Sequence, residues 1–137
     1  MAERLRAAGF LVEGISVVPD DQALISQRLR EMADQEGLNL AVTTGGTGLA
    51  PSDQTPEATL AVIDRLVPGL AEAMRLAGLA KTPHAALSRA VAGARGGCLI
   101  VNLPGSPRGA VESLEAILEA LPHGLEKLAG DPTPCAG

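Results

Sequence analysis

The sequence is almost devoid of aromatic side chains: its 137 residues include one Phe and no Tyr or Trp. Proteins that bind single-stranded nucleic acids use aromatic rings as stacking platforms, so this class of function is disfavoured. The formal net charge of −5 also argues against a surface that binds nucleic acid or an anionic membrane. The hydrophobic core must therefore be built from Leu, Val, Ile and Ala.

Cysteine is equally scarce, with Cys98 in an apolar run and Cys135 close to the end of the chain. Neither residue has the spacing of a metal site or of a CxxC redox motif, which predicts a reducing compartment and no disulfide. The sequence also lacks a signal peptide and an apolar run long enough to span a membrane. These absences predict a cytoplasmic protein.

Helical and strand patterns alternate along the chain, which predicts one α/β domain over residues 1–130 with a mostly parallel sheet. A disordered tail is expected at residues 131–137. The expected strands are 10–18, 38–44, 85–93 and 98–104, and the expected helices are 2–8, 21–35, 56–67, 70–77, 107–121 and 124–129.

The chain opens on a helix, which is unusual for this class of fold. In doubly wound folds, the first helix normally follows a first strand that lies near the middle of the sheet. We therefore expect that the sequence is truncated at its N-terminus and lacks that first strand.

Two of the expected strands end in glycine turns that lead into helices. The first turn, Gly45–Gly48, follows strand 38–44, and the second turn, Gly105-Ser106, follows strand 98–104. Ligands of parallel sheets bind outside the carboxyl ends of the strands, so both turns should lie at one edge of the sheet. Glycine allows close approach of the backbone to a phosphate, and helix N-termini direct N–H groups at it. The Gly45–Gly48 run is neither a P-loop nor a GxGxxG fingerprint, and glycines also serve ordinary turns.

Two carboxylates are placed to act at the same edge. Asp53 follows the first glycine turn, and Asp20 follows the predicted strand 10–18. Either side chain is suited to hold Mg²⁺ against a phosphate. The alternatives are structural, with Asp20 as a helix N-cap and Asp53 as an Asx-turn residue.

Other reactive side chains have no visible partners in the sequence. Ser88 and Ser106 lack a nearby base, so a serine nucleophile is not expected. His84 and His123 each lie near a proline and are interpreted as satisfied or solvent-facing residues. Arg89 and Arg108 are the cations nearest to the predicted glycine turns.

Four motifs, taken in order, carry a resemblance to a known family: TTGGTG, PSDQTPEAT, LSRAVAG and NLPGSPRG. Together they resemble the molybdopterin-binding domain family, in its MogA/MoaB branch of molybdenum-cofactor biosynthesis proteins. The resemblance extends over residues 2–129. It implies a three-layer α/β/α domain, a homotrimer, and an enzyme that uses Mg-ATP to adenylylate the terminal phosphate of molybdopterin and releases pyrophosphate.

The resemblance also implies site residues. The family's two important carboxylates match Asp20 and Asp53, which are expected to be catalytic and to hold Mg²⁺. The residues expected to contact molybdopterin and nucleotide are Thr44, Gly45, Gly46, Thr47, Gly48, Ser88, Arg89, Pro104, Gly105, Ser106 and Pro107. A phosphate monoester is largely ionised at pH 7, so no general base is needed, in keeping with the missing catalytic triad. Other proteins of molybdenum-cofactor biosynthesis are further expected partners.

The departure from the family lies at the N-terminus, where a strand and a loop with polar residues are missing. Either strands 10–18 and 38–44 pair directly, or a gap leaves their backbone groups unpaired, at about 1–3 kcal/mol for each buried group. The alternatives to an adenylyltransferase are a protein that binds molybdopterin or its precursor without turnover, and an inactive truncated paralogue.

Overall fold

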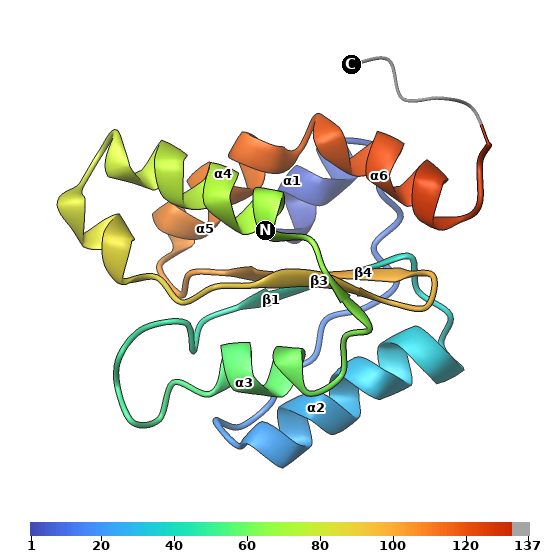
Figure 1. Cartoon of the computed structure of the whole chain (residues 1–137), viewed down its shortest axis with the longest axis horizontal. Helices are drawn as coiled ribbons and strands as arrows, with labels where there is room; N and C mark the ends of the chain where they lie inside the picture. Colours follow the sequence, from blue (N-terminus) through green and yellow to red (C-terminus); the bar gives the residue numbers. More distant parts are fainter. Residues whose placement is uncertain (133–137) are drawn as a thin grey trace.

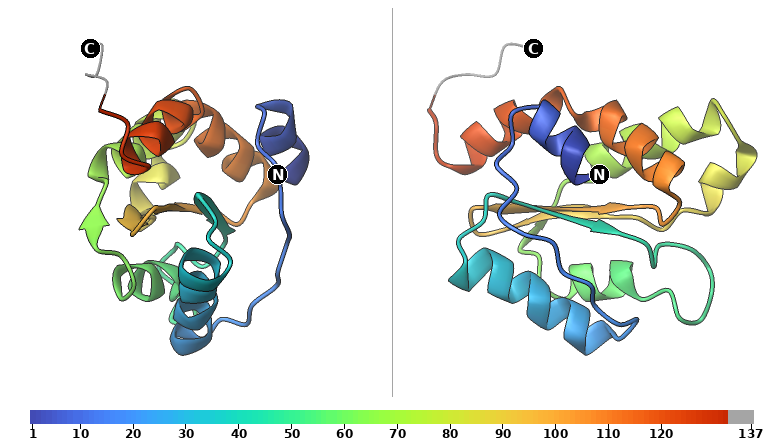
Figure 2. Two further views of the ribbon diagram at one scale, coloured as in Figure 1. Left: turned by 90° about the vertical axis from the view of Figure 1, so that its right-hand side faces the viewer. Right: turned by 180° about the vertical axis from the view of Figure 1, so that it is seen from behind.

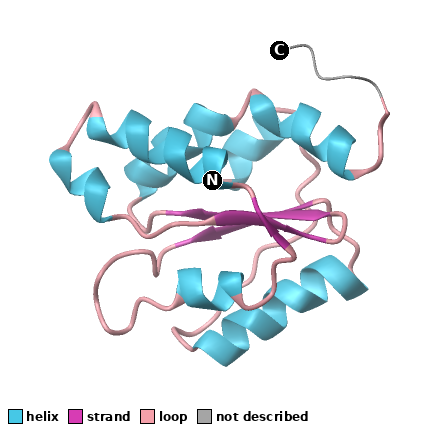
Figure 3. Cartoon of the chain, viewed as in Figure 1, coloured by secondary structure: helices cyan, strands magenta, loops and turns pink. Residues whose placement is uncertain are grey.

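The computed structural model describes residues 1–132, which form a sheet enclosed between two helical layers (Figure 1). Helices α1 (Ala2–Ala7), α4 (Pro68–Leu79), α5 (Pro107–Ile117) and α6 (Ala120–Leu128) form one layer. Helices α2 (Gln22–Arg30) and α3 (Thr55–Leu60) form the other (Figure 3). The predicted three-layer α/β/α architecture is confirmed. Most of the predicted tail, 133–137, lies outside the described residues.

The sheet has the order β1-β4-β3-β2, with strands β1 (Leu40–Thr44), β2 (Arg65–Leu66), β3 (Ala92–Arg95) and β4 (Cys98–Leu103). Strands β1 and β4 are parallel, whereas the pairs β3–β4 and β2–β3 are antiparallel. The sheet is therefore mixed, and the expectation of a mostly parallel sheet is corrected. The short turn at Gly96 and Gly97 joins β3 to β4 as a hairpin, which requires antiparallel pairing.

Residues 10–18 do not form the predicted strand. The segment runs extended from one helical layer to the other, across the outside of the sheet edge that β1 forms (Figure 2). Phe10 packs against the core beside α1, and Val18 packs against the core beside α2. Between these anchors, the side chains of Leu11, Ile15 and Val17 are 83%, 77% and 98% exposed.

Strand β1 is consequently an edge strand within the described chain, because β4 is its single neighbour. Of the two outcomes expected for a missing first strand, direct pairing of 10–18 with 38–44 does not occur. The Nε atom of Arg28 donates a hydrogen bond of 3.2 Å to the Ser16 hydroxyl and so ties the crossing segment to α2.

The expected helix 21–35 is confirmed within one residue, whereas several other element boundaries differ from those expected. Helix α2 begins after Asp21, whose carboxylate accepts a hydrogen bond from Leu24 N–H, and continues as a π-helical turn, η1 (Glu31–Gln35). Helix α3 ends at Leu60, and the chain that was expected to continue it forms β2 instead. The predicted strand 85–93 begins within a 3₁₀ turn, η2 (Pro83–Leu87), and continues irregularly, with β3 starting only at Ala92.

Two apolar clusters cover the two faces of the sheet. Leu103, Leu114 and Leu121 lie in the cluster between β4 and helices α5 and α6, all at most 1% exposed. The other cluster places Leu29 and Val62 against the opposite face of the sheet. In the part of the chain that the structure describes, no helix is long and apolar enough to cross a membrane.

Candidate functional site

The two glycine turns meet at the carboxyl ends of β1 and β4. Because these strands are parallel neighbours, their ends lie at the same edge of the sheet. The N–H group of Gly45 donates a hydrogen bond of 3.0 Å to the carbonyl of Leu103. A Cβ atom on Gly105 would stand 3.3 Å from the Gly45 Cα atom. The predicted convergence of the two turns is thus confirmed, and their backbones are in direct contact.

Gly46 joins the first turn to helix α3. Its φ angle is +68°, in the region that favours glycine, and a Cβ atom there would collide with the Thr55 hydroxyl. The carbonyl of Gly46 accepts a hydrogen bond of 3.2 Å from Thr55 N–H. A side chain at position 46 would therefore separate the turn from the start of the helix.

The second turn caps helix α5. The Ser106 hydroxyl accepts a hydrogen bond of 3.0 Å from Gly109 N–H, and Pro107 occupies the first helical position. This arrangement is a standard N-terminal cap. It explains Ser106 and Pro107 structurally, while Ser106 also lines the pocket described below.

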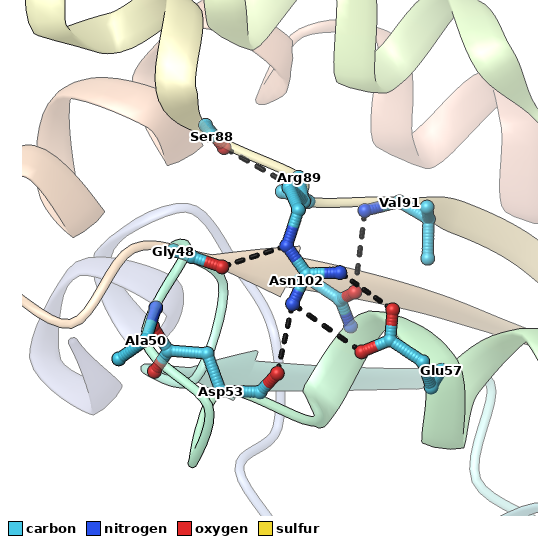
Figure 4. Close-up of polar contacts among 9 residues, drawn as sticks. Gly48, Ala50, Asp53, Glu57, Ser88, Arg89, Val91 and Asn102 are labelled. Atoms are coloured by element: carbon cyan, nitrogen blue, oxygen red, sulfur yellow. Dashed lines mark hydrogen bonds and ion pairs between the residues drawn. The ribbon is translucent and has the colours of Figure 1, made fainter.

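Arg89 holds the first turn in place (Figure 4). Its Nε atom donates to the carbonyl of Gly48 at 2.7 Å, and its Nη2 atom donates to the carbonyl of Asp53 at 2.8 Å. The Nη1 atom lies 2.5 Å from Oε2 of Glu57, and Nη2 lies 3.3 Å from Oε1. Hydrogen bonding to Arg89 lowers the pKa of the Glu57 carboxyl below its ordinary value.

Asp53 makes two hydrogen bonds within the same loop, both to Ala50. Its Oδ2 atom accepts a hydrogen bond of 3.0 Å from Ala50 N–H, and Asp53 N–H donates to the Ala50 carbonyl at 2.9 Å. The carboxylate therefore has a structural role in the loop, but the bond runs to the third residue before Asp53, so the Asx-turn interpretation is wrong. The half-buried carboxylate retains further acceptor sites for a cation.

Asp20 is exposed and is not the helix cap, since Asp21 fills that role. The start of α2 nevertheless lies beside the residue after Asp53, because Gln22 N–H donates to the Gln54 side chain at 2.9 Å. Asp20 and Asp53 thus belong to neighbouring segments. Among residues 1–132, no group of three or more His, Cys, Asp or Glu side chains is placed to hold a metal ion.

A pocket of about 340 Å³ opens beside the two turns. Five of the predicted contact residues line it: Thr47, Gly48, Ser88, Pro104 and Ser106. The inner wall is apolar, with Ala71, Met74 and Ala90. The cationic side chains Arg75 and Lys81 also contribute to the wall, as does His84. A flat apolar ring system with a phosphate at the turns would match this lining.

Asn102 is a residue of the site that was not predicted from the sequence. Its side chain is fully buried and donates to the hydroxyls of Thr43 and Thr59, both at 3.0 Å, while its Oδ1 atom accepts from Val91 N–H at 3.2 Å. It lines the pocket and links β1, α3 and the segment after Arg89. The only polar residue in the run CLIVNL was the available signal.

Comparisons with known proteins agree with this geometry. The family model described as a probable molybdopterin binding domain matches residues 1–123. The chain belongs to this molybdopterin-binding family. The match confirms the family resemblance expected from the four sequence motifs.

Individual curated relatives are similar to this chain in sequence. The molybdopterin adenylyltransferase of Haemophilus influenzae is 50% identical over 101 residues, covering 74% of this chain and 51% of the relative. The Helicobacter pylori (strain J99) molybdopterin adenylyltransferase is 44% identical over 115 residues, covering 84% of this chain and 65% of the relative. The chain thus spans about half to two thirds of the length of these curated relatives.

Solved structures agree with the fold. The molybdopterin biosynthesis enzyme MoaB from Thermus thermophilus superposes with a TM-score of 0.89 at 60% identity, covering 96% of this chain and 82% of that one. The molybdopterin biosynthesis Mog protein from Mycobacterium ulcerans gives the same TM-score of 0.89 at 44% identity, covering 95% and 84% of the two chains.

Proposed function

We propose that this protein is a molybdopterin adenylyltransferase of molybdenum-cofactor biosynthesis. The observation that carries the proposal is the contact between the two glycine turns at the rim of an apolar pocket. Glycine turns that precede a helix bind phosphates through their backbone N–H groups, and an apolar pocket wall can pack against a ring system. The names of the curated relatives supply the reaction.

The proposed reaction needs little from side chains. An ionised oxygen of the terminal phosphate of molybdopterin attacks the α-phosphorus of ATP, and the bond to the bridging oxygen breaks so that pyrophosphate leaves. No proton has to be removed from the nucleophile. The protein must instead align two polyanions and stabilise the charge that develops between them, through backbone N–H groups and nearby cations.

Asp53 and Asp20 are the residues that we propose hold Mg²⁺. Carboxylate oxygens are the ligands that this ion prefers, and it is normally shared with substrate phosphates. The Asp53 carboxylate is held in the first turn by Ala50 N–H, so that it is fixed relative to Gly48. When bound, the ion would neutralise phosphate charge; the carboxylates' own task is to position it.

The proposal is tested with purified protein, ATP, Mg²⁺ and molybdopterin, by measuring the release of pyrophosphate. We expect turnover in the wild type and a loss of about a hundredfold or more in Asp53→Asn. Asp64→Asn is the matched control, because Asp64 likewise accepts a main-chain N–H, from Gly96 at 2.7 Å, on the hairpin at the far end of β3 and β4. Full activity in Asp53→Asn would refute the role of Asp53.

The pyrophosphate assay, combined with a binding titration of molybdopterin, separates the alternatives. Saturable molybdopterin binding without pyrophosphate release would identify a binding protein that does not adenylylate its ligand. Absence of both binding and turnover in a cooperatively folded protein would identify an inactive paralogue. A homotrimer in the cytoplasm is part of the proposal, and light scattering coupled to gel filtration measures the oligomeric state.

A further inference from the structure

Arg89 makes three hydrogen bonds to the first glycine turn and the loop that follows it. Besides the two side-chain bonds to the carbonyls of Gly48 and Asp53, its own N–H group donates to the carbonyl of Thr47 at 2.8 Å. Three carbonyl groups within seven residues of chain therefore point toward one arginine.

The guanidinium has little capacity left for a ligand. It carries five N–H donors in a fixed plane. Its four contacts to Gly48, Asp53 and the two carboxylate oxygens of Glu57 occupy most of them. Glu57 lies in the first turn of α3, so the arginine connects that helix to the loop.

The direction of the carbonyl groups fixes the direction of the neighbouring N–H groups. In a trans peptide the C=O and N–H bonds point in opposite directions. The carbonyls of Thr47 and Gly48 point to Arg89, so the N–H groups of Gly48 and Leu49 point away from it. Within residues 1–132, neither N–H group has a hydrogen-bond acceptor. Both donors are therefore free to bind a ligand, and Gly48 lines the pocket.

We propose that Arg89 is a positioning residue that orients the N–H groups of Gly48 and Leu49 toward the phosphate of the nucleotide. The inference rests on the proposed function for the identity of the ligand. Arg89 acts through the loop, and Glu57 holds Arg89 in the plane that the loop requires. A lysine cannot replace it, because one ammonium group on a flexible stem does not reach all of these acceptors.

The test compares Arg89→Lys with Arg95→Lys. Arg95 is a matched control: it also donates to both carboxylate oxygens of one residue, Asp34, and to one carbonyl, that of Val62. We expect Arg89→Lys to weaken ATP binding, measured by calorimetry with Mg²⁺, by about tenfold or more, and Arg95→Lys to change it less than about twofold.

Glu57→Gln distinguishes positioning from direct contact. If Arg89 bound the phosphate itself, loss of the Glu57 charge would leave ATP affinity unchanged or raise it. We expect instead a loss in the same direction as for Arg89→Lys, and a double variant that is no worse than Arg89→Lys alone. An unchanged or raised affinity in Glu57→Gln would overturn the proposal.

Hydrogen exchange gives a readout that does not depend on activity. The hydrogen-bonded loop amides of Ala50 and Asp53 should exchange at least about tenfold faster in Arg89→Lys, while those of β4 keep their protection. If the wild type neither binds nor turns over ATP but the loop still loosens in Arg89→Lys, the proposed function fails and the positioning role stands. If the loop amides do not change, the positioning role is refuted even where the enzyme is active.

Discussion

The backbone of Gly105 lies against the backbone of Gly45, so that a Cβ atom on Gly105 would stand 3.3 Å from the Gly45 Cα atom. The two turns that define the candidate site are thus held at contact distance. The neighbour of Gly105 is main chain rather than a flexible side chain, so it has little freedom to move away.

Gly105→Ala should force the two turns apart. We expect a loss of about 1–3 kcal/mol in the free energy of unfolding, measured with denaturant, together with weaker binding of ATP. Gly97→Ala is the control, because a Cβ atom at Gly97 meets nothing within 4 Å. Equal stability and equal ATP affinity in the two variants would show that the turns are not in contact.

Asn102 also stabilises the sheet edge at which the two glycine turns meet. Its side chain is fully buried, donates hydrogen bonds to the hydroxyls of Thr43 and Thr59, and accepts one from the N–H group of Val91. Asn102→Leu keeps a similar volume but leaves the Val91 N–H group without its acceptor, at a cost of about 1–3 kcal/mol for that group alone. Thermal or denaturant unfolding measures the loss.

The control for Asn102 is Asn39→Leu, which also replaces an asparagine but at an exposed position before β1. It should change the free energy of unfolding by no more than about 0.5 kcal/mol. An Asn102→Leu variant as stable as this control would contradict the buried network.

The extended segment 10–18 gives a third prediction. Val17 is 98% exposed, so Val17→Ser should change the free energy of unfolding by less than about 0.5 kcal/mol. Leu29 is 2% exposed, and Leu29→Ala should cost about 2–5 kcal/mol. In hydrogen exchange, amides 11–17 should exchange rapidly while those of Leu99–Val101 are protected. Protection of amides 11–17 would show that they form a strand after all.

This segment also shows what the sequence determines and what it leaves open. The run FLVEGISVV has the composition of a buried strand, yet strand formation needs a neighbour with free N–H and C=O groups beside it. Local pattern cannot report the path of the segment, which here crosses outside the free edge of β1 without pairing with it. The same limit explains the error at Arg65 and Leu66, where a helical pattern gives way to pairing with β3.

The meeting of the two glycine turns was predicted more accurately than the strands, for a physical reason. Glycines that allow close backbone contact, and a proline at the start of a helix, carry their meaning locally, so Gly45, Gly105 and Pro107 were identified from sequence. Hydrogen-bond partners distant in sequence were not: Arg89 was expected to contact the ligand, whereas its guanidinium bonds to the loop and to Glu57, which lies 32 positions away in the sequence. Asn102 escaped notice because its partners come from three separate segments.

Cys98 gives a prediction on the pH dependence of stability. Burial raises the pKa of its thiol from 9.0 to about 11. Between these two pH values the unfolded chain has released the thiol proton and the folded chain has kept it. The contribution to stability is therefore fully present below about pH 9 and is lost as pH rises to about 11, a loss of roughly 2–3 kcal/mol.

The measurement compares the wild type with Cys98→Ala by denaturant unfolding at pH 8 and pH 11, with Cys135→Ser in both proteins so that one thiol titrates. Groups other than Cys98 titrate alike in the two proteins, so the difference between them isolates the thiol. We expect the stability advantage of the protein that retains Cys98 to shrink by roughly 2–3 kcal/mol over this range. A difference that stays constant would mean that the thiol ionises as readily in the folded chain as in the unfolded one, which its 1% exposure argues against.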